Sequence, residues 1–251
     1  MKGRKKRMEL GFTTLMRCFF RTYLVGANFN TRGMQNIGLA FAIDPGLEAL
    51  YSSAKQLRRA RKRYLHHYNT HPFWTPLLVG FFLFLERKIS KGLLPERSVS
   101  NIKGTTMYTL SAIGDSFFGG ALLVFWSLTT IHFLLLERYS LAFGWSAVWF
   151  ISLQGLKMYT LYQGYQNGLL FLQRLKQWDL INWSQRIKVV NAILVVALWA
   201  VVFPLASPEY WFPAAAAVCS LAWLGSKIYW AREILLLIYV LACVAILHLF
   251  L

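Results

Sequence analysis

Apolar residues form long runs in the chain from residue 73 onward. The runs cover residues 73–85, 107–136, 189–206, 212–230 and 234–251, and a more polar run at 141–163 carries Gln154, Lys157 and Gln163. An α-helix rises about 1.5 Å per residue, so about 20 residues are needed to cross the hydrocarbon core of a bilayer. The pattern predicts four to six membrane-embedded helices, and the last three runs are predicted to be ordinary spans.

Two of the runs do not have the pattern of a simple span. Residues 73–85 are too few to cross, which indicates a segment that enters the membrane and turns back. Residues 107–136 are numerous enough, but Gly114 and two later glycines surround Asp115 and favour a broken helix or a hairpin tip. Discontinuous helices of this kind build substrate sites in transporters.

The first 70 residues have a different pattern, which is amphipathic and basic. Apolar residues recur at spacings close to three and four, at Leu47, Leu50, Tyr51, Ala54, Leu57, Tyr64, Leu65 and Tyr68. Five cations cluster between them, at Arg58, Arg59, Arg61, Lys62 and Arg63. We predict a helix that lies on a membrane surface, with docking of a cytosolic partner as the alternative. Residues 1–70 then form a basic surface region and residues 71–251 a membrane-embedded region.

Composition and charge support this organisation. The chain has 251 residues, of which 57% are hydrophobic and 15% charged, against about a quarter charged in soluble domains. We therefore predict an all-α polytopic membrane protein with broken or re-entrant helices. The net charge is +17, and 19 of the 27 Lys and Arg residues lie in residues 1–103, where they flank or precede apolar segments. This distribution favours anionic lipid as the partner over nucleic acid.

The N-terminus and the metal-binding residue types add two expectations. Residues 1–7 are strongly basic and no clean apolar run follows them, so we expect no cleaved signal peptide and a cytoplasmic N-terminus. The three cysteines, Cys18, Cys219 and Cys243, are scattered without paired spacing. His67 and His71 have no carboxylate or cysteine nearby in sequence, so no metal site or other cofactor is predicted.

Asp115 is a candidate functional residue because residues 107–136 contain no Lys, Arg or Glu. An ionisable side chain among lipid tails costs on the order of 2.5 to 3.5 kcal/mol even on the mildest scale. It therefore usually faces a protein interior or a wet pathway, although a cap on a short break between helices also explains it. Asn69 and His71, just before Pro72, offer the paired donors and acceptors that hydroxyl recognition requires.

Several short strings occur in one order that resembles a known family. They are Phe19-Phe20-Arg21, Gly26-Ala27-Asn28-Phe29-Asn30, Met34-Gln35-Asn36-Ile37-Gly38, Pro45 with Leu50-Tyr51, Tyr68-Asn69-Thr70-His71-Pro72-Phe73, Ile102-Lys103 and Ala112-Ile113-Gly114-Asp115-Ser116. The order resembles the IID component of the mannose/fructose/sorbose-type phosphoenolpyruvate-dependent sugar phosphotransferase system. A looser likeness continues through residues 162–175, so the resemblance covers nearly the whole chain.

The resemblance implies a bacterial inner-membrane subunit that pairs with a IIC component to bind and carry a hexose inward. It also implies that a cytoplasmic IIB protein, served by IIA, phosphorylates the sugar, while the IID chain is neither phosphorylated nor catalytic. Family members are trimers of IIC and IID pairs. The candidate substrate-binding residues are Gln35, Asn36, Asn69 and His71. Gly114, Asp115 and Ser116 are placed at a helix tip near the substrate path.

Departures from the family pattern keep two other functions open. The Glu-Arg pair that usually precedes Met-Gln is replaced here by residues without an acid, Thr31-Arg32-Gly33. The Gly-Pro and the second Gly that usually lie ahead of Ile-Gly-Asp are replaced by Tyr108, Thr109 and Ala112. A divergent scaffold or regulatory protein that retains IIC but does not transport is the first alternative. A membrane enzyme acting on lipid is the second, although no nucleophile and base arrangement supports it.

Overall fold

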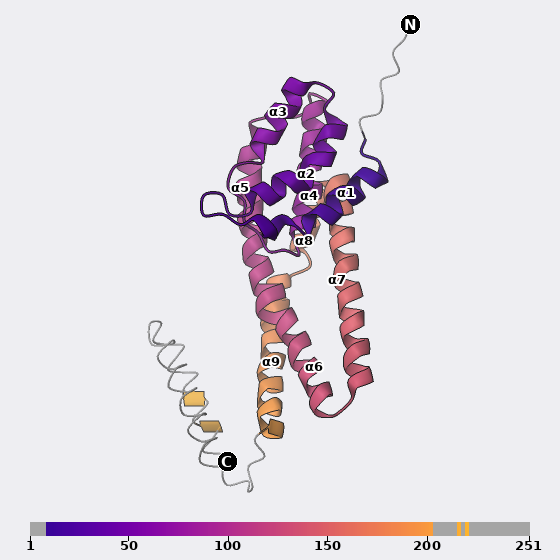
Figure 1. Cartoon of the computed structure of the whole chain (residues 1–251). Coiled ribbons are helices and arrows are strands. Elements are labelled where there is room, and N and C mark those ends of the chain that lie inside the picture. The colour runs from indigo at the N-terminus through magenta and orange to yellow at the C-terminus, as the bar shows by residue number, and fades with distance from the viewer. Residues whose placement is uncertain (1–8, 203–214, 217–218, 221–251) are drawn as a thin grey trace. The chain divides into compact units, whose positions relative to one another are not determined.

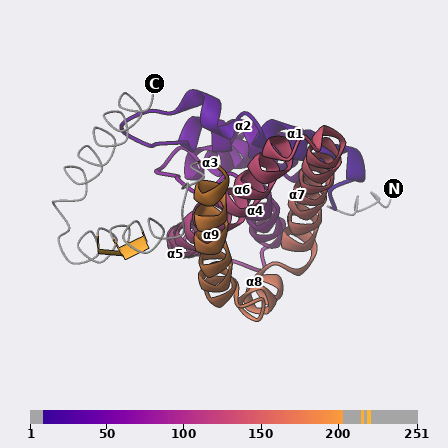
Figure 2. The same cartoon turned by 90° about the horizontal axis from the view of Figure 1, so that it is seen from below.

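The computed structural model describes residues 9–202, together with residues 215–216 and 219–220. Within these residues every named element is helical. The elements are α1 (Phe12–Thr22), η1 (Val25–Asn28), α2 (Asn36–Leu50), α3 (Ala54–Arg63), α4 (Thr75–Ser90), α5 (Ser98–Gly114), η2 (Asp115–Leu122), α6 (Leu123–Leu135), α7 (Tyr139–Asn167), α8 (Leu169–Lys176) and α9 (Leu180–Val202) (Figures 1 and 2). The all-α prediction is confirmed. Contacts divide the chain into a unit that ends at Val195 and another that begins at Val196.

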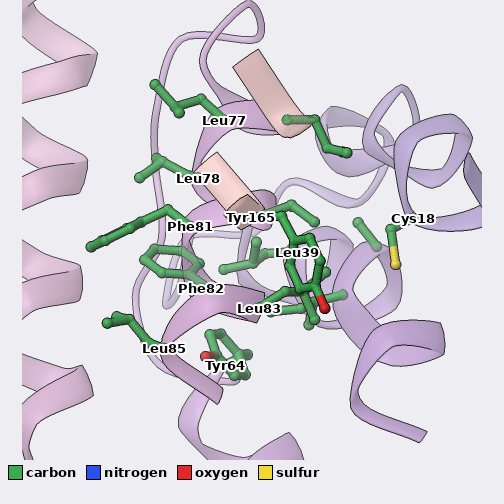
Figure 3. Packing of buried hydrophobic residues seen from close by; sticks show 14 of the residues in the cluster. Cys18, Leu39, Tyr64, Leu77, Leu78, Phe81, Phe82, Leu83, Leu85 and Tyr165 are labelled. Atoms are coloured by element: carbon green, nitrogen blue, oxygen red, sulfur yellow. The ribbon is translucent and has the colours of Figure 1, made fainter. Parts of the chain in front are cut away.

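Helix α4 is the centre of the core. Its first turn contains Pro76, which is tolerated there because the first amides of a helix lack intrahelical partners. Apolar residues surround most of the helix, so it is buried on all sides, with neighbours such as Leu39 and Tyr165 (Figure 3). α4 and α7 approach closely because both have glycine at the contact: a Cβ on Gly80 would overlap the Leu161 carbonyl oxygen. That this segment enters the bilayer and turns back stays a prediction.

A buried ion pair fixes α3 on α4. Glu86 is fully buried and accepts two hydrogen bonds from Arg63, from Nε at 2.9 Å and from Nη2 at 2.6 Å. The hydroxyls of Tyr51 and Tyr64 donate to the same carboxylate at 2.6 and 2.8 Å. Burial alone lowers the pKa of Arg63, but the hydrogen bonds and charge of Glu86 raise it. The acid at the end of the apolar run is therefore fully neutralised within the protein.

The expected basic amphipathic helix is two helices, so the prediction of one helix through residues 47–68 is wrong. α2 ends at Leu50 and α3 begins at Ala54, with Tyr51 in an extended conformation between them (φ −115°, ψ 113°). The break has a physical cause, because leaving the helix lets the Tyr51 hydroxyl reach the buried Glu86 carboxylate. Whether residues 1–70 form a membrane-surface region stays a prediction, but α1 and α2 pack directly on α4.

The expected hairpin tip at Asp115 is also wrong. α5, η2 and α6 form one continuous helix of 38 residues, Ser98–Leu135, in which η2 has π-helical hydrogen bonding. The chain turns back only after α6, where Glu137 has φ 57°, and α7 returns beside α6 (Figure 1). The glycines around Asp115 therefore loosen the helix without interrupting it.

Side chains of α9 satisfy the backbone of the π-helical segment. Ser184 Oγ donates to the Ser116 carbonyl oxygen at 2.8 Å, and Asn191 Nδ2 donates to the Ala121 carbonyl oxygen at 2.9 Å. Lys188 Nζ lies 3.5 Å from Ser116 Oγ, which it can reach as a donor. The three α9 residues are spaced by four and three, so they lie on one face of that helix. The carbonyl groups that the wide π-helical turn frees therefore have hydrogen-bond partners on α9, which removes the cost of leaving them unpaired.

Ser98–Leu135 and Leu180–Val202 are the two described helices that are long and apolar enough to cross a membrane. Most of their surface is not buried by the protein, unlike the core helix of a soluble domain. The span expected at 189–206 begins nine residues earlier, at Leu180. The spans expected at 212–230 and 234–251 lie outside the described residues, apart from residues 215–216 and 219–220.

Candidate functional site

The segment of residues 68–74, between α3 and α4, lies against the start of α2. The backbone N–H of Gln35 donates to the Tyr68 carbonyl oxygen at 2.8 Å, and the backbone N–H of Tyr68 donates to the Gly33 carbonyl oxygen at 3.1 Å. The Gln35 side chain accepts a long hydrogen bond of 3.4 Å from the Thr70 amide. The structure therefore brings Gln35 beside the segment that carries Asn69 and His71, which are more than 30 residues away in sequence.

Within this segment, His71 packs against the π-helical region. Its ring stacks on Phe73 and on Phe118, each at a centroid distance of 5.5 Å. Gly114 makes the approach possible, because a Cβ there would collide with the His71 Cβ. Burial lowers the pKa of His71, the charge of Asp115 raises it, and the charge of Lys157 lowers it again. A neutral imidazole offers one donor and one acceptor.

Three buried polar atoms of this segment have no hydrogen-bond partner among the described residues. They are Tyr68 Oη, Thr70 Oγ1 and Trp74 Nε1. The Tyr68 hydroxyl faces Thr75, but without the geometry of a normal hydrogen bond. Each buried polar group that lacks a partner costs about 1 to 3 kcal/mol. Three unpartnered polar atoms within seven residues indicate a place where a ligand or water completes the hydrogen bonding.

A partly open cavity of about 150 Å³ borders the segment at Pro72. Its walls come from the end of α1, the start of α2, the segment itself and α7. The lining residues are Thr22, Tyr23, Val25, Gly26, Gln35, Pro72, Thr75 and Lys157. Gln35 is thus the predicted site residue that lines the cavity, while His71 and Asn69 do not.

Lys157 is a cation that the sequence alone placed only in a more polar run. Its Nζ lies 4.6 Å from the ring centroids of both Tyr23 and Phe73. Two aromatic faces stabilise a cation by an electrostatic attraction that is stronger when the pair is desolvated. No carboxylate lies within ion-pair distance of Lys157 in the part of the chain that the structure describes. The sequence does carry one signal for Lys157, which is its position as a lone lysine in a long helix with few charges.

Two of the predicted binding residues have other surroundings. The Asn36 side chain is fully engaged: Oδ1 accepts from Asn30 Nδ2 at 2.9 Å, and Nδ2 donates to the Leu65 carbonyl oxygen at 2.6 Å. Asn36 therefore holds two loops together. The backbone N–H of Asn69 donates to Met107 Sδ at 3.2 Å. The side chain of Asn69 is half-buried and makes no hydrogen bond to another described residue.

Asp115 and Ser116 open the π-helical segment and differ in burial. The Asp115 side chain is exposed in the isolated chain, whereas Ser116 is half-buried and its Oγ lies 3.0 Å from Ser184 Oγ. Asp115 is near enough to His71 to affect its pKa, so both belong to one neighbourhood. No group of three His, Cys, Asp or Glu residues suited to a metal ion occurs within the described part of the chain.

Two long apolar helices that the protein leaves mostly unburied are typical of a helical membrane protein. Its family follows from sequence: the model of the PTS system mannose/fructose/sorbose family IID component matches residues 9–248. The chain therefore belongs to that family, as the resemblance of its short motifs predicted.

Individual relatives match a smaller part. The mannose-specific EIID component of Escherichia coli K12 is 31% identical over 104 residues, which are 41% of this chain and 37% of that protein. The fructose permease IID component of Bacillus subtilis is 25% identical over 120 residues, 47% of this chain and 43% of that protein. The aligned parts thus span less than half the length of either relative.

Solved structures show the same fold. The mannose transporter ManYZ in complex with microcin E492 matches with a TM-score of 0.58 and 23% identity, over 76% of this chain and 70% of that one. A second structure, described as a membrane protein, matches with a TM-score of 0.64 and 21% identity over the same shares. Both likenesses concern the fold alone.

Proposed function

We propose that this chain is the IID subunit of a sugar phosphotransferase system that pairs with a IIC component to bind and translocate a hexose. A cytoplasmic IIB protein, supplied by IIA, phosphorylates the sugar, and the chain itself contributes no catalytic group. Family membership supports the pairing, and the ManYZ fold likeness supports the architecture. The assembly is a trimer of IIC and IID pairs in the bacterial inner membrane, with the N-terminus of this chain in the cytoplasm.

The cavity beside Gln35 is the observation that carries the sugar role. An engineered cavity of about 150 Å³ holds benzene, so this cavity is large enough for the ring of a hexose, while its open side leaves the ring hydroxyls room to project. Gln35 provides an amide, Thr22 and Thr75 provide hydroxyls, and Tyr23 provides an aromatic face. Sugars combine hydroxyls that need paired donors and acceptors with an apolar ring face, and these walls offer both.

The other predicted residues then have different roles. Asn69 and His71 belong to the same segment but do not line the cavity, and they bind sugar hydroxyls where the path meets the IIC subunit. Asn36 is a positioning residue, because its amide already holds the loops at Asn30 and Leu65. Asp115 and Ser116 shape the helix beside the path.

We expect Gln35→Ala to reduce phosphorylation-coupled sugar uptake about tenfold or more, with no change in the amount of IIC that co-purifies. The reason is that a sugar hydroxyl left without its partner costs about 1 to 3 kcal/mol. Uptake of radiolabelled mannose, fructose and sorbose into vesicles carrying the IIC–IID pair is the measurement. Gln166→Ala, at an exposed glutamine of α7, is the control.

Wild-type uptake of at least one hexose is required for the proposal to stand. Unchanged uptake in Gln35→Ala would place the sugar elsewhere. A complex that retains IIC yet moves no hexose, even as wild type, would instead support the non-transporting scaffold.

Asp115→Asn should preserve assembly with IIC, because the substitution keeps the shape of an exposed side chain and removes only its charge. The yield of IIC recovered with an affinity-tagged variant is the measurement, compared with Asp179→Asn at an exposed acid outside the site. Loss of IIC from Asp115→Asn alone would mean that this carboxylate is an assembly contact.

A further inference from the structure

The cations of α3 fall into two sets. Arg61 and Arg63 point back to the protein: Arg61 pairs with Asp44 and Glu48, each at 2.7 Å, and Arg63 pairs with Glu86 and Glu96. The second set is Lys55, Arg58, Arg59 and Lys62, which we call the α3 stripe. None of its members has a carboxylate within 4.0 Å among the residues that the structure describes.

The α3 stripe is one face of the helix. Its members are separated by three, one and three residues, the i, i+3, i+4, i+7 pattern that aligns side chains along a helix. All four are exposed or nearly so. The pairing of Arg61 and Arg63 fixes the rotation of α3, so the unpaired cations are presented outward together.

The turn between α6 and α7 locates the hydrocarbon layer relative to this stripe. Glu137 and Arg138 are charged and mark one bilayer face. About 20 residues cross the hydrocarbon, which places the other face near Phe117 on the outgoing helix. Lys157 of α7 and Phe118 both contact the Phe73 ring, so residues 68–74 lie at the level of this second face.

The α3 stripe lies well beyond that second face. Ser98, at the start of α5, precedes Ser116 by 18 residues, or about 27 Å of helix. α3 is fixed near this end of α5, since Arg63 Nη1 lies 2.9 Å from Glu96 and Lys103 Nζ lies 5.7 Å from the Tyr64 ring. Figure 1 shows α3 at the end of this unit opposite the α6–α7 turn.

This distance argues against lipid as the main counter-charge of the α3 stripe. The headgroup layer adds only about 5 to 8 Å on each side of the hydrocarbon. The field of anionic headgroups then decays over a Debye length of about 8 Å at physiological salt. On this placement the α3 stripe lies beyond the reach of the headgroup charges, so a protein partner fits it better than the membrane surface.

We propose that the α3 stripe binds an acidic face of the soluble IIB protein that delivers the phosphoryl group. The inference rests on the proposed function, which requires a soluble donor on the side of the membrane where residues 68–74 lie. Four unpaired cations on one helix match a cluster of carboxylates, and charges of this kind mainly steer and orient a transient partner. The α3 stripe is then a docking surface, distinct from the cavity at Gln35.

The test uses the full chain with IIC in vesicles of phosphatidylcholine, which carry no net lipid charge. The Kd of the soluble IIB protein is measured by co-sedimentation for the wild type, for Arg58→Glu/Arg59→Glu, and for Arg174→Glu/Lys176→Glu as a matched control on α8. We expect the α3 variant to weaken IIB binding about tenfold or more at low salt and the control to change it less than about threefold. Added salt should reduce the difference.

Three results would overturn the proposal. The first is equal weakening by both double variants, and the second is no weakening by either. The third is unchanged IIB binding together with lost binding of the α3 variant to phosphatidylglycerol vesicles, which would assign the stripe to lipid. If Arg58→Glu/Arg59→Glu fails to assemble with IIC, Lys55→Gln/Lys62→Gln replaces it. Sugar uptake into the same vesicles is scored separately and judges the proposed function, because IIB binding does not require turnover.

Discussion

Glu86→Gln should lower the thermal stability of the protein more than loss of any exposed ion pair. Glu86 is fully buried, and its carboxylate accepts four hydrogen bonds from Arg63, Tyr51 and Tyr64. The substitution leaves the charge of Arg63 with only the half-exposed Glu96. Breaking a buried pair from one side costs about 3 to 5 kcal/mol. For a chain of this size, that corresponds to a fall in Tm on the order of 10 °C.

The measurement is a thermal melt of the purified protein in detergent, followed by tryptophan fluorescence. Glu48→Gln is the matched control, because its pair with Arg61 has side chains that are 58% and 44% exposed. Exposed pairs contribute about 0 to 1 kcal/mol, so the control should melt within a few degrees of the wild type. Equal melting of both variants would show that the buried pair does not hold α3 on α4.

The same buried pair connects stability to the docking surface. Arg63 and Glu86 determine which side of α3 faces the core, and the α3 stripe is the opposite side. A variant that releases Arg63 should therefore also disorder the presentation of Lys55, Arg58, Arg59 and Lys62. This coupling explains why a helix of ten residues with seven charged or amide side chains remains helical, since such a short segment is marginal in isolation.

The all-α class followed from the apolar runs, but the form of the long helix did not. Gly114 and the glycines after it predicted a break, and the structure has a π-helical segment instead. The difference arises from α9, where Ser184 and Asn191 donate to the carbonyls that the wider turn frees. These donors are about 70 residues away, so no local pattern indicates that the strained turn has partners.

The depth of Asp115 depends on the same long helix. Residues 107–136 read as one apolar run centred on the membrane, which placed the acid near the bilayer interior. The helix actually begins at Ser98, and the charged turn at Glu137 anchors its other end. If that turn marks one bilayer face, Asp115 is predicted to lie near the opposite edge of the hydrocarbon, where an exposed carboxylate is far less costly.

The candidate site was predictable where short motifs carry it and unpredictable where long-range packing does. Gln35 and His71 came from the motif resemblance, and the backbone bonds between Gln35 and Tyr68 bring their segments together. Lys157 and Trp74 join them only through the fold. A pattern of spacings cannot show that a cation from α7 lies between the rings of Tyr23 and Phe73.

Gly114→Ala should abolish most sugar uptake while leaving the IIC–IID pair assembled. A Cβ at this position would collide with His71 Cβ and lie 2.8 Å from Trp74 Cδ1. Both neighbours are held in a packed aromatic group with Phe118, so they cannot move independently. Overpacking of this kind costs about 1 to 3 kcal/mol and shifts the backbone. The shift displaces the segment that carries Asn69 and His71, and with it one wall of the cavity at Gln35.

Gly104→Ala is the matched control, because it lies on the same helix α5 and its added Cβ would meet nothing within 4 Å. It should leave uptake unchanged and stabilise the helix by up to about 1 kcal/mol. Vesicle uptake and the amount of co-purified IIC are measured for both variants. Full uptake by Gly114→Ala would mean that the contact between α5 and residues 68–74 has no part in sugar transport. A loss of IIC from that variant alone would instead move the role of this contact from the sugar path to subunit assembly.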